Sequence, residues 1–177
     1  FKAQRCLLEP GRFKPPKAMS GHHSARFVLA VAPVRHGYSF VLFEGPESPF
    51  DWGTKTIKGE MRDSQTLDGV AALLARYRPV LLVLEASVSS SRRALRVKRL
   101  LKRLAVLAQA EGILVVRYSR AEVKAAFAST GATTKYEIAE TIARQIPALA
   151  YRLPPVRKIW MSEDPRQSLF DAASLGL

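Results

Sequence analysis

Apolar and polar residues follow one another in a pattern that predicts strands first and helices later. Residues 26–33 and 37–44 form nearly continuous apolar runs, and residues 51–59 alternate between the two kinds of side chain. Short turns separate these runs, so we expect three antiparallel strands joined as a meander. Residues 64–77 place apolar side chains at helical spacing, and the apolar run 80–85 that follows predicts a fourth strand.

The second half of the chain predicts helices that alternate with one more strand. The helix that begins near Arg92 and ends at Gly112 carries an apolar stripe at helical spacing: Val97, Leu100, Leu101, Leu104, Leu107 and Ala108. Residues 113–118 then predict a strand. Two capping boxes, at residues 119–122 and 134–137, predict the starts of short helices.

Prolines and one acid mark the end of the chain. Residues 147–162, which include Pro154 and Pro155, predict a loop. Asp164 as N-cap and Pro165 at the first helical position predict the start of a last helix. The order of elements predicts an α/β fold with a mixed five-stranded sheet, three antiparallel then two parallel strands, and helices on both faces.

The length of 177 residues suits one domain with a real core. Residues 1–24 are basic and contain prolines, so we expect a mobile leader before a folded domain at 25–177. No apolar run approaches eighteen residues and no secretion signal opens the chain, so no membrane contact is expected. Cys6 is the only cysteine, which excludes an intramolecular disulfide and favours a reducing, cytoplasmic location.

A large positive charge adds a partner to this picture. Lys and Arg total 28 against 15 acids, a formal charge of +13, and such an excess favours binding to nucleic acid. Seven of the residues from 92 to 103 are basic. Four of them share one helix face and three flank it: Arg92, Arg96, Arg99 and Arg103, with Arg93, Lys98 and Lys102. The face either follows a phosphate backbone or is an ordinary solvated surface.

Two acids are the candidates for chemistry on a phosphate. Glu85 ends the predicted strand 80–85, and Asp171 lies on the last predicted helix. Carboxylates from separate elements can converge on divalent cations and activate a water for phosphodiester cleavage. The alternatives are structural: Glu85 could cap the next helix or pair with Arg92 or Arg93, and Asp171 could be a surface carboxylate.

Several stretches, in this order and spacing, resemble the RuvC type of Holliday-junction resolvase, a family with the ribonuclease H-like fold. The resemblance covers about 150 residues from Arg26 to the end. The stretches are Phe27-Val28-Leu29-Ala30-Val31-Ala32-Pro33 with Gly37-Tyr38, Val83-Leu84-Glu85, Ser119-Arg120-Ala121-Glu122-Val123-Lys124 with Gly131 and Lys135, and Phe170-Asp171-Ala172-Ala173-Ser174-Leu175.

By this resemblance, Glu85 and Asp171 are catalytic acids and ligands of Mg²⁺ (or Mn²⁺). Lys124 and Lys135 contact phosphates near the scissile bond. The implied activity is metal-dependent endonuclease cleavage of branched or four-way-junction DNA, by a homodimer that matches the two-fold symmetry of the junction.

The chain departs from the family at two acidic positions. The first-strand Asp falls on Ala32, and the earlier acid of the last helix falls on Ser168. Asp164, seven residues before Asp171, would lie on nearly the same helical face and could replace the missing ligand. An N-cap is its other role.

Three explanations of Ala32 stay open: an engineered inactivating change, a natural non-catalytic relative, or another acid in its place. The rival to a nuclease is therefore a non-catalytic nucleic-acid-binding protein on the same fold. A basic protein–protein adaptor of a nucleoprotein assembly is a third possibility.

Overall fold

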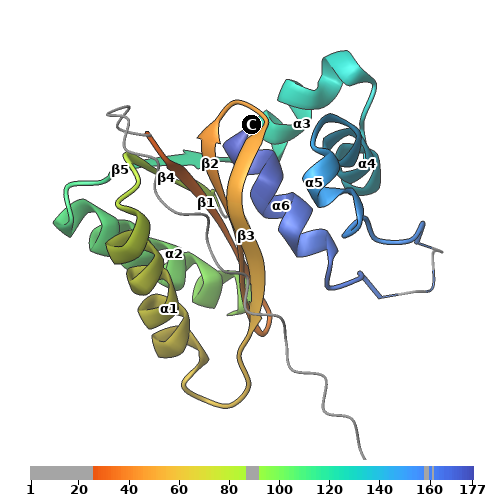
Figure 1. The fold of residues 1–177 in the computed structure, drawn as a ribbon. Coiled ribbons are helices and arrows are strands. Elements are labelled where there is room, and N and C mark those ends of the chain that lie inside the picture. Colours follow the sequence, from red (N-terminus) through yellow and green to blue (C-terminus); the bar gives the residue numbers. More distant parts are fainter. Residues whose placement is uncertain (1–25, 87–91, 158–159, 161) are drawn as a thin grey trace, which may run out of the picture.

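The computed structural model describes residues 26–86, 92–157, 160 and 162–177 (Figure 1). The predicted leader, residues 1–24, lies outside them. The strands are β1 (Val28–Val34), β2 (Gly37–Gly45), β3 (Ser48–Thr56), β4 (Leu81–Glu85) and β5 (Leu114–Tyr118). The helices are α1 (Arg62–Tyr77), α2 (Arg92–Ala110), α3 (Arg120–Phe127), α4 (Lys135–Gln145), α5 (Pro147–Ala150) and α6 (Gln167–Gly176), with a 3₁₀ turn at Ala128–Thr130.

The five strands form one sheet in the order β3-β2-β1-β4-β5. Neighbours among β1, β2 and β3 are antiparallel, whereas β4 pairs in parallel with both β1 and β5. The predicted mixed sheet is therefore confirmed. Parallel strands end at the same side of a sheet, so the carboxyl ends of β1, β4 and β5 lie together, and Glu85 is at that side.

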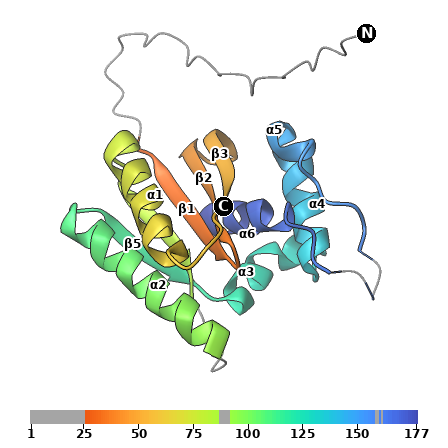
Figure 2. The same ribbon diagram turned by 90° about the horizontal axis from the view of Figure 1, so that it is seen from below.

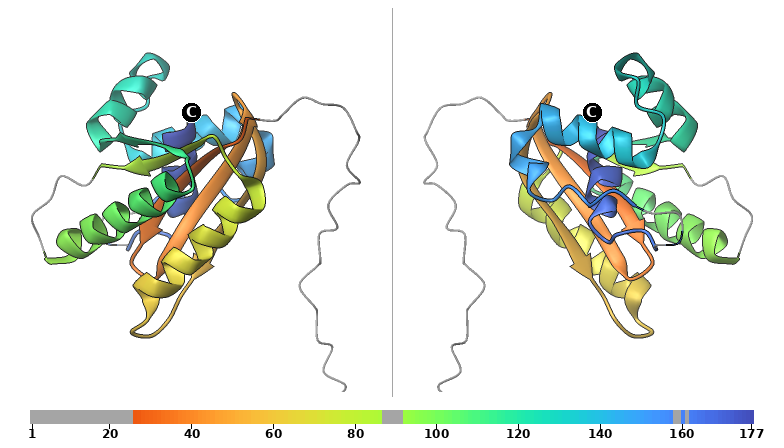
Figure 3. Two further views of the ribbon diagram at one scale, coloured as in Figure 1. Left: turned by 90° about the vertical axis from the view of Figure 1, so that its left-hand side faces the viewer. Right: turned by 90° about the vertical axis from the view of Figure 1, so that its right-hand side faces the viewer.

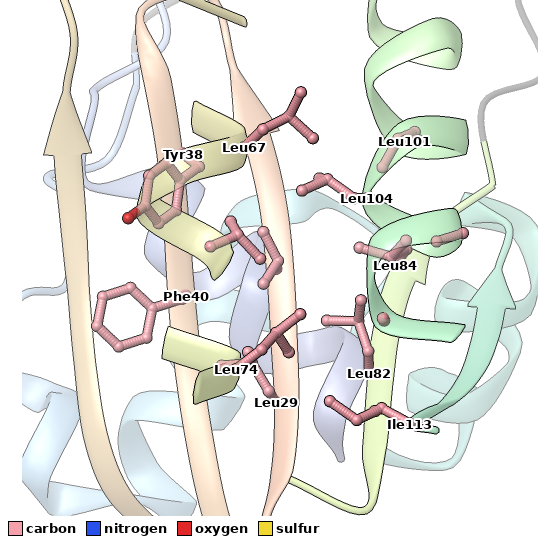
Figure 4. Packing of buried hydrophobic residues seen from close by; sticks show 14 of the residues in the cluster. Leu29, Tyr38, Phe40, Leu67, Leu74, Leu82, Leu84, Leu101, Leu104 and Ile113 are labelled. Carbon is pink, nitrogen blue, oxygen red and sulfur yellow. The ribbon is translucent and has the colours of Figure 1, made fainter. Parts of the chain in front are cut away.

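Helices cover both faces of the sheet (Figures 2 and 3). On one face, α1 and α2 pack over a core rich in leucine, which includes Leu29, Leu82, Leu84 and Leu104 (Figure 4). On the other face, α6 lies against the sheet and α4 packs on α6. Among the described helices, none is long and apolar enough to cross a membrane.

Small residues let α6 approach the central strand. Ala30 and Ala32 point from β1 toward α6, because side chains alternate along a strand and Leu29 and Val31 point to the other face. Gly176 of α6 lies directly on the sheet. A Cβ atom there would stand 2.4 Å from the Phe43 ring and 3.3 Å from the Ala30 Cβ. This close packing fixes where the acid of α6 lies.

Two predictions near the end of the chain were wrong. Within the predicted loop 147–162, residues 147–150 form α5, because Leu149 is buried and Pro147 is tolerated at a first helical position. The last helix begins at Gln167 and not at Asp164. The backbone N–H of Gln167 donates to the Asp164 carbonyl three residues back, so the chain enters α6 through a tight turn.

Candidate functional site

Glu85 and Asp171 line the same pocket, which has a volume of about 280 Å³. Glu85 is the last residue of β4 and points to the α6 face, since its neighbour Leu84 points into the core under α1 and α2. Asp171 comes from α6. We call this cavity the Glu85–Asp171 pocket. Its lining is Glu85, Arg120, Val123, Lys124, Thr133, Thr134, Lys135, Ile138, Gln167, Phe170, Asp171, Ser174 and Leu175.

Both lysines predicted to contact phosphates line this pocket, together with Arg120. The Lys135 Nζ atom lies 3.1 Å from Asp171 Oδ2 and 2.5 Å from Glu163 Oε1, so one ammonium group compensates two carboxylates. The Arg120 Nε atom lies 3.8 Å from Glu85 Oε1, and both side chains are exposed. That exposed pair is weak. Lys135 therefore neutralises the acid of α6 far more directly than Arg120 neutralises Glu85.

Two capping boxes hold the helix ends that line the pocket, as predicted. Ser119 caps α3 with Glu122, and Thr134 caps α4 with Glu137. The Glu137 carboxylate accepts hydrogen bonds from the backbone N–H groups of Thr133 and Thr134, at 2.7 and 2.9 Å. These bonds lower the pKa of Glu137 to about 2. Lys135, the first residue of α4, is thus held on a well-capped helix start.

Ala32 lies beside Glu85 in the sheet. The parallel register pairs Val31 with Leu84, so the next residues along the two strands are Ala32 and Glu85. Ala32 is 3% exposed and packs in the core under α6. A carboxylate at position 32 would therefore stand next to Glu85, but the methyl group that is present offers no oxygen.

Ser168 is joined to a buried chain of hydroxyl groups. Its Oγ donates to the Pro165 carbonyl at 2.7 Å and lies 2.7 Å from Ser39 Oγ, which lies 2.9 Å from Thr54 Oγ1. A hydroxyl has one proton, so Ser39 donates to Ser168 and Thr54 donates to Ser39. Ser168 thus ties α6 to β2. Ser168 lies three residues before Asp171, and Ser174 lies three residues after it. Ser174 lines the pocket.

Asp164 does not line the Glu85–Asp171 pocket, so the prediction that it shares a helix face with Asp171 was wrong. It precedes α6, and its carboxylate accepts hydrogen bonds from the backbone N–H and guanidinium of Arg166 at 2.8–3.0 Å. The Arg166 side chain lowers the pKa of Asp164. Asp164 lines a neighbouring pocket of about 320 Å³, which shares Thr134, Lys135 and Gln167 with the first.

The residues around the pocket do not fit a two-cation centre. Within residues 26–86, 92–157, 160 and 162–177, no three acids, histidines or cysteines are grouped so that they could hold a metal ion. Glu85 and Asp171 are two carboxylates, and the Lys135 ammonium is bonded to one of them. Two-metal phosphodiester cleavage needs several carboxylates that converge on cations roughly 3.5–4 Å apart. The donor set is therefore too small.

The basic helix face lies across the sheet from the pocket, because α2 packs with α1 on the other face. Arg96 donates three hydrogen bonds to Asp63 of α1, at 2.6–3.1 Å, and so joins the two helices. Arg99 and Arg103 are exposed. The side chains of Arg92 and Arg93 lie outside the described part of the chain. The predicted nucleic-acid contacts of these five arginines stay predictions.

Of the pocket residues that the predicted site did not include, Arg120 and Ser174 are polar and could have been found from the sequence. Arg120 lies four residues before Lys124 on α3, and residues four apart share a helix face. Ser174 lies three residues after Asp171, which is also same-face spacing. Helical spacing from the predicted residues would have found both.

Comparison with known proteins identifies the fold. Two structures of RuvC from Thermus thermophilus match the chain. One, in complex with Holliday junction substrate, has 18% sequence identity and a TM-score of 0.62, and the match covers 85% of this chain and 90% of that chain. The other has 20% identity and a TM-score of 0.61, with the same coverage. No protein-family model and no curated protein matches the sequence.

These values confirm the predicted RuvC-like, ribonuclease H-like fold over most of the chain. At this level of identity the likeness concerns the fold alone. The chemistry of this chain must be argued from its own residues.

Proposed function

We propose that this chain is a RuvC-like protein that binds branched or structured DNA at the Glu85–Asp171 pocket without cleaving it. The observation that carries the proposal is the neighbourhood of Glu85: the adjacent strand position holds Ala32, and the ammonium of Lys135 is bonded to Asp171. Three cations of the lining, Arg120, Lys124 and Lys135, can contact phosphates. The RuvC fold and its junction complex support DNA as the partner.

Charge supports binding as the main activity. The formal charge of +13 favours phosphate contacts through release of counterions. At the pocket itself, the Lys135 ammonium forms ion pairs with Asp171 and Glu163, so these carboxylates repel an incoming phosphate less. A site built in this way needs no divalent cation to accept DNA.

Cleavage is the second candidate, and one observation favours it. Glu85 and Asp171 come from distant parts of the chain and still line one pocket, which is the arrangement that metal-dependent hydrolysis with Mg²⁺ or Mn²⁺ would use. For this candidate the chain would have to recruit a further ligand in place of Ala32. The two-fold dimer implied by the resemblance is compatible with both candidate functions, DNA binding alone and DNA cleavage.

The test compares binding and cleavage on the same substrates. Labelled four-way junctions, duplex, single strands and RNA are incubated with the protein in EDTA, Mg²⁺ or Mn²⁺, beside Ala32→Asp. We expect tight, salt-dependent binding of the junction in EDTA and no cleavage by the unchanged protein. Cleavage by the unchanged protein would establish the second candidate. Cleavage by Ala32→Asp alone would identify a disabled nuclease.

Two lysine variants test the pocket itself. Lys124→Ala should lower the slope of log affinity against log salt by about 0.9, one phosphate contact. Lys135→Ala should weaken binding more, because it also leaves Asp171 and Glu163 uncompensated beside the DNA. Lys58→Ala, an exposed lysine outside the pocket lining, is the matched control and should bind as the unchanged protein does. Equal binding by all three variants would contradict the proposal.

A further inference from the structure

A second cationic hollow lies between α2 and β5, with a volume of about 530 Å³. We call it the α2–β5 groove. Lys98, Arg99 and Lys102 reach it from α2, and Arg117 reaches it from β5. Of the eight described residues that line the groove, none is acidic. It lies on the α2 face of the sheet, since Arg117 is two residues from Val115, which packs under α2.

The four cations of the groove stand together without an acidic partner in the part of the chain that the structure describes. Among the described residues, no ion pair joins any of the four to an acid. Elsewhere on α2 the chain does pair an arginine, since Arg96 is bonded to Asp63 where α2 meets α1. Like charges at helical spacing repel one another. The side chains are exposed, so packing does not explain why these like charges are grouped. A polyanion in the groove would relieve their repulsion.

The groove adjoins the Glu85–Asp171 pocket around the end of β5. Arg117 lines the groove, and Arg120, three residues later, lines the pocket. Three residues of extended chain span at most about 11 Å. The register pairs Glu85 with Tyr118, so this crossing lies at the carboxyl ends of β4 and β5. Tyr118 lies between the two arginines in the sequence, and its side chain is 42% exposed.

We infer that the α2–β5 groove holds the phosphate backbone of a second nucleic-acid segment, continuous around the end of β5 with the segment in the pocket. The inference rests on the proposed function and extends it to a second face of the sheet. Charge selects this occupant over a second copy of the chain. Two such grooves brought face to face would oppose four cations to four cations.

Matched triple variants test the inference. Lys98→Ala, Lys102→Ala and Arg117→Ala remove two lysines and one arginine from the groove. Lys55→Ala, Lys58→Ala and Arg144→Ala remove the same residue types from exposed positions that line neither cavity. Each triple lowers the formal charge by three, from +13 to +10. A thermal melt checks that both fold.

We expect the groove triple to bind a four-way junction at least ten-fold more weakly than the control triple. Its salt slope should fall by as much as about 2.7, three contacts at about 0.9 each. A photo-crosslinker on Lys98→Cys, in a Cys6→Ser background, should capture DNA, and one on Arg144→Cys should not. The crosslink separates direct contact from a general effect of charge.

Other outcomes overturn the inference in distinguishable ways. Should the groove triple bind as the control does while Lys124→Ala is weakened, the groove is not a DNA contact and the proposed function stands. If the unchanged protein binds no nucleic acid, the proposed function itself fails. A groove triple that changes sedimentation but not DNA binding would instead assign the groove to contact between copies.

Discussion

The two faces of the sheet are covered by helices that use different chemistry. Under α1 and α2 the core is made of large side chains such as Leu82 and Leu104, and the ion pair between Arg96 and Asp63 lies at the rim. Under α6 the side chains of the central strand β1 are small, Ala30 and Ala32, and polar groups lie within the packing, including the hydroxyl chain from Thr54 to Ser168. The apolar core under α1 and α2 stabilises the fold. The close contact of α6 with the sheet, with its hydrogen-bonded polar groups, fixes the position of the site.

Truncation of the leucine layer should give the largest loss of stability. Leu104 is fully buried, so Leu104→Ala removes apolar contact and leaves a cavity, at a cost of about 3 kcal/mol. Urea unfolding measures the change. Because Leu104 lies across the sheet from the Glu85–Asp171 pocket, Lys124→Ala should weaken DNA binding by the same factor in folded Leu104→Ala as in the unchanged protein. A different factor after correction for folding would show that the two faces are coupled.

A matched pair of glycines separates stability from site geometry. An added Cβ would meet the Tyr38 hydroxyl at 2.4 Å in Gly69→Ala, on α1, and the Phe43 ring at 2.4 Å in Gly176→Ala, on α6. Overpacking should cost each variant about 1–2 kcal/mol, partly offset by the helix propensity of alanine. We expect only Gly176→Ala to weaken DNA binding, because it displaces the helix that carries Asp171. Equal loss of binding in both variants would contradict this difference.

The hydroxyl chain should contribute a smaller and non-additive effect. Ser168→Ala leaves the Ser39 hydroxyl without its acceptor, at a cost of about 1–2 kcal/mol. The double variant with Ser39→Ala should cost less than the sum of the two single changes, because the buried donor and its acceptor disappear together. A double-mutant cycle by urea unfolding measures the coupling. Additive costs would show that the two serines do not act as a pair.

The rim ion pair should give the smallest effect and a distinct pH dependence. Both side chains are more than a third exposed, so Asp63→Asn should cost about 0.5 kcal/mol at pH 7. The hydrogen bond from Arg96 lowers the pKa of Asp63 below its ordinary 3.8. The pair therefore stabilises the fold above about pH 4, and that contribution is lost as the pH falls through the lowered pKa. Urea unfolding at pH 7, 5 and 3 should show the stability difference between the two proteins become smaller at the lowest pH.

Much of this fold could be predicted because strand patterns and caps are local. The apolar run that ends at Glu85 fixed a strand end, and the capping boxes of α3 and α4 fixed two helix starts. The predicted start of α6 was wrong because the Asp164 carboxylate accepts a hydrogen bond from Arg166 in a turn. Such a turn competes with a helix start and cannot be recognised from the pattern of apolar and polar residues.

The pairings at the site could not be predicted in the same way. Lys135 meets Glu163 across 28 residues, and much of the chain between them is the loop predicted over residues 147–162, which has no periodic pattern. The bond from Arg96 to Asp63 depends on how α1 and α2 cross, which their sequences do not state. Helical spacing alone, in contrast, would have added Arg120 and Ser174 to the predicted pocket.

The capping glutamates of α3 and α4 have a consequence for how the molecule recognises an anion. Helix beginnings commonly bind phosphate with their free amide groups, but here the carboxylates of Glu122 and Glu137 accept hydrogen bonds from the N-cap amides of Ser119 and Thr134. The negative charge of these carboxylates at the helix starts favours capture of a phosphate by side-chain ammonium and guanidinium groups instead. The two helix ends keep their shape when empty, so little ordering should accompany capture of the ligand.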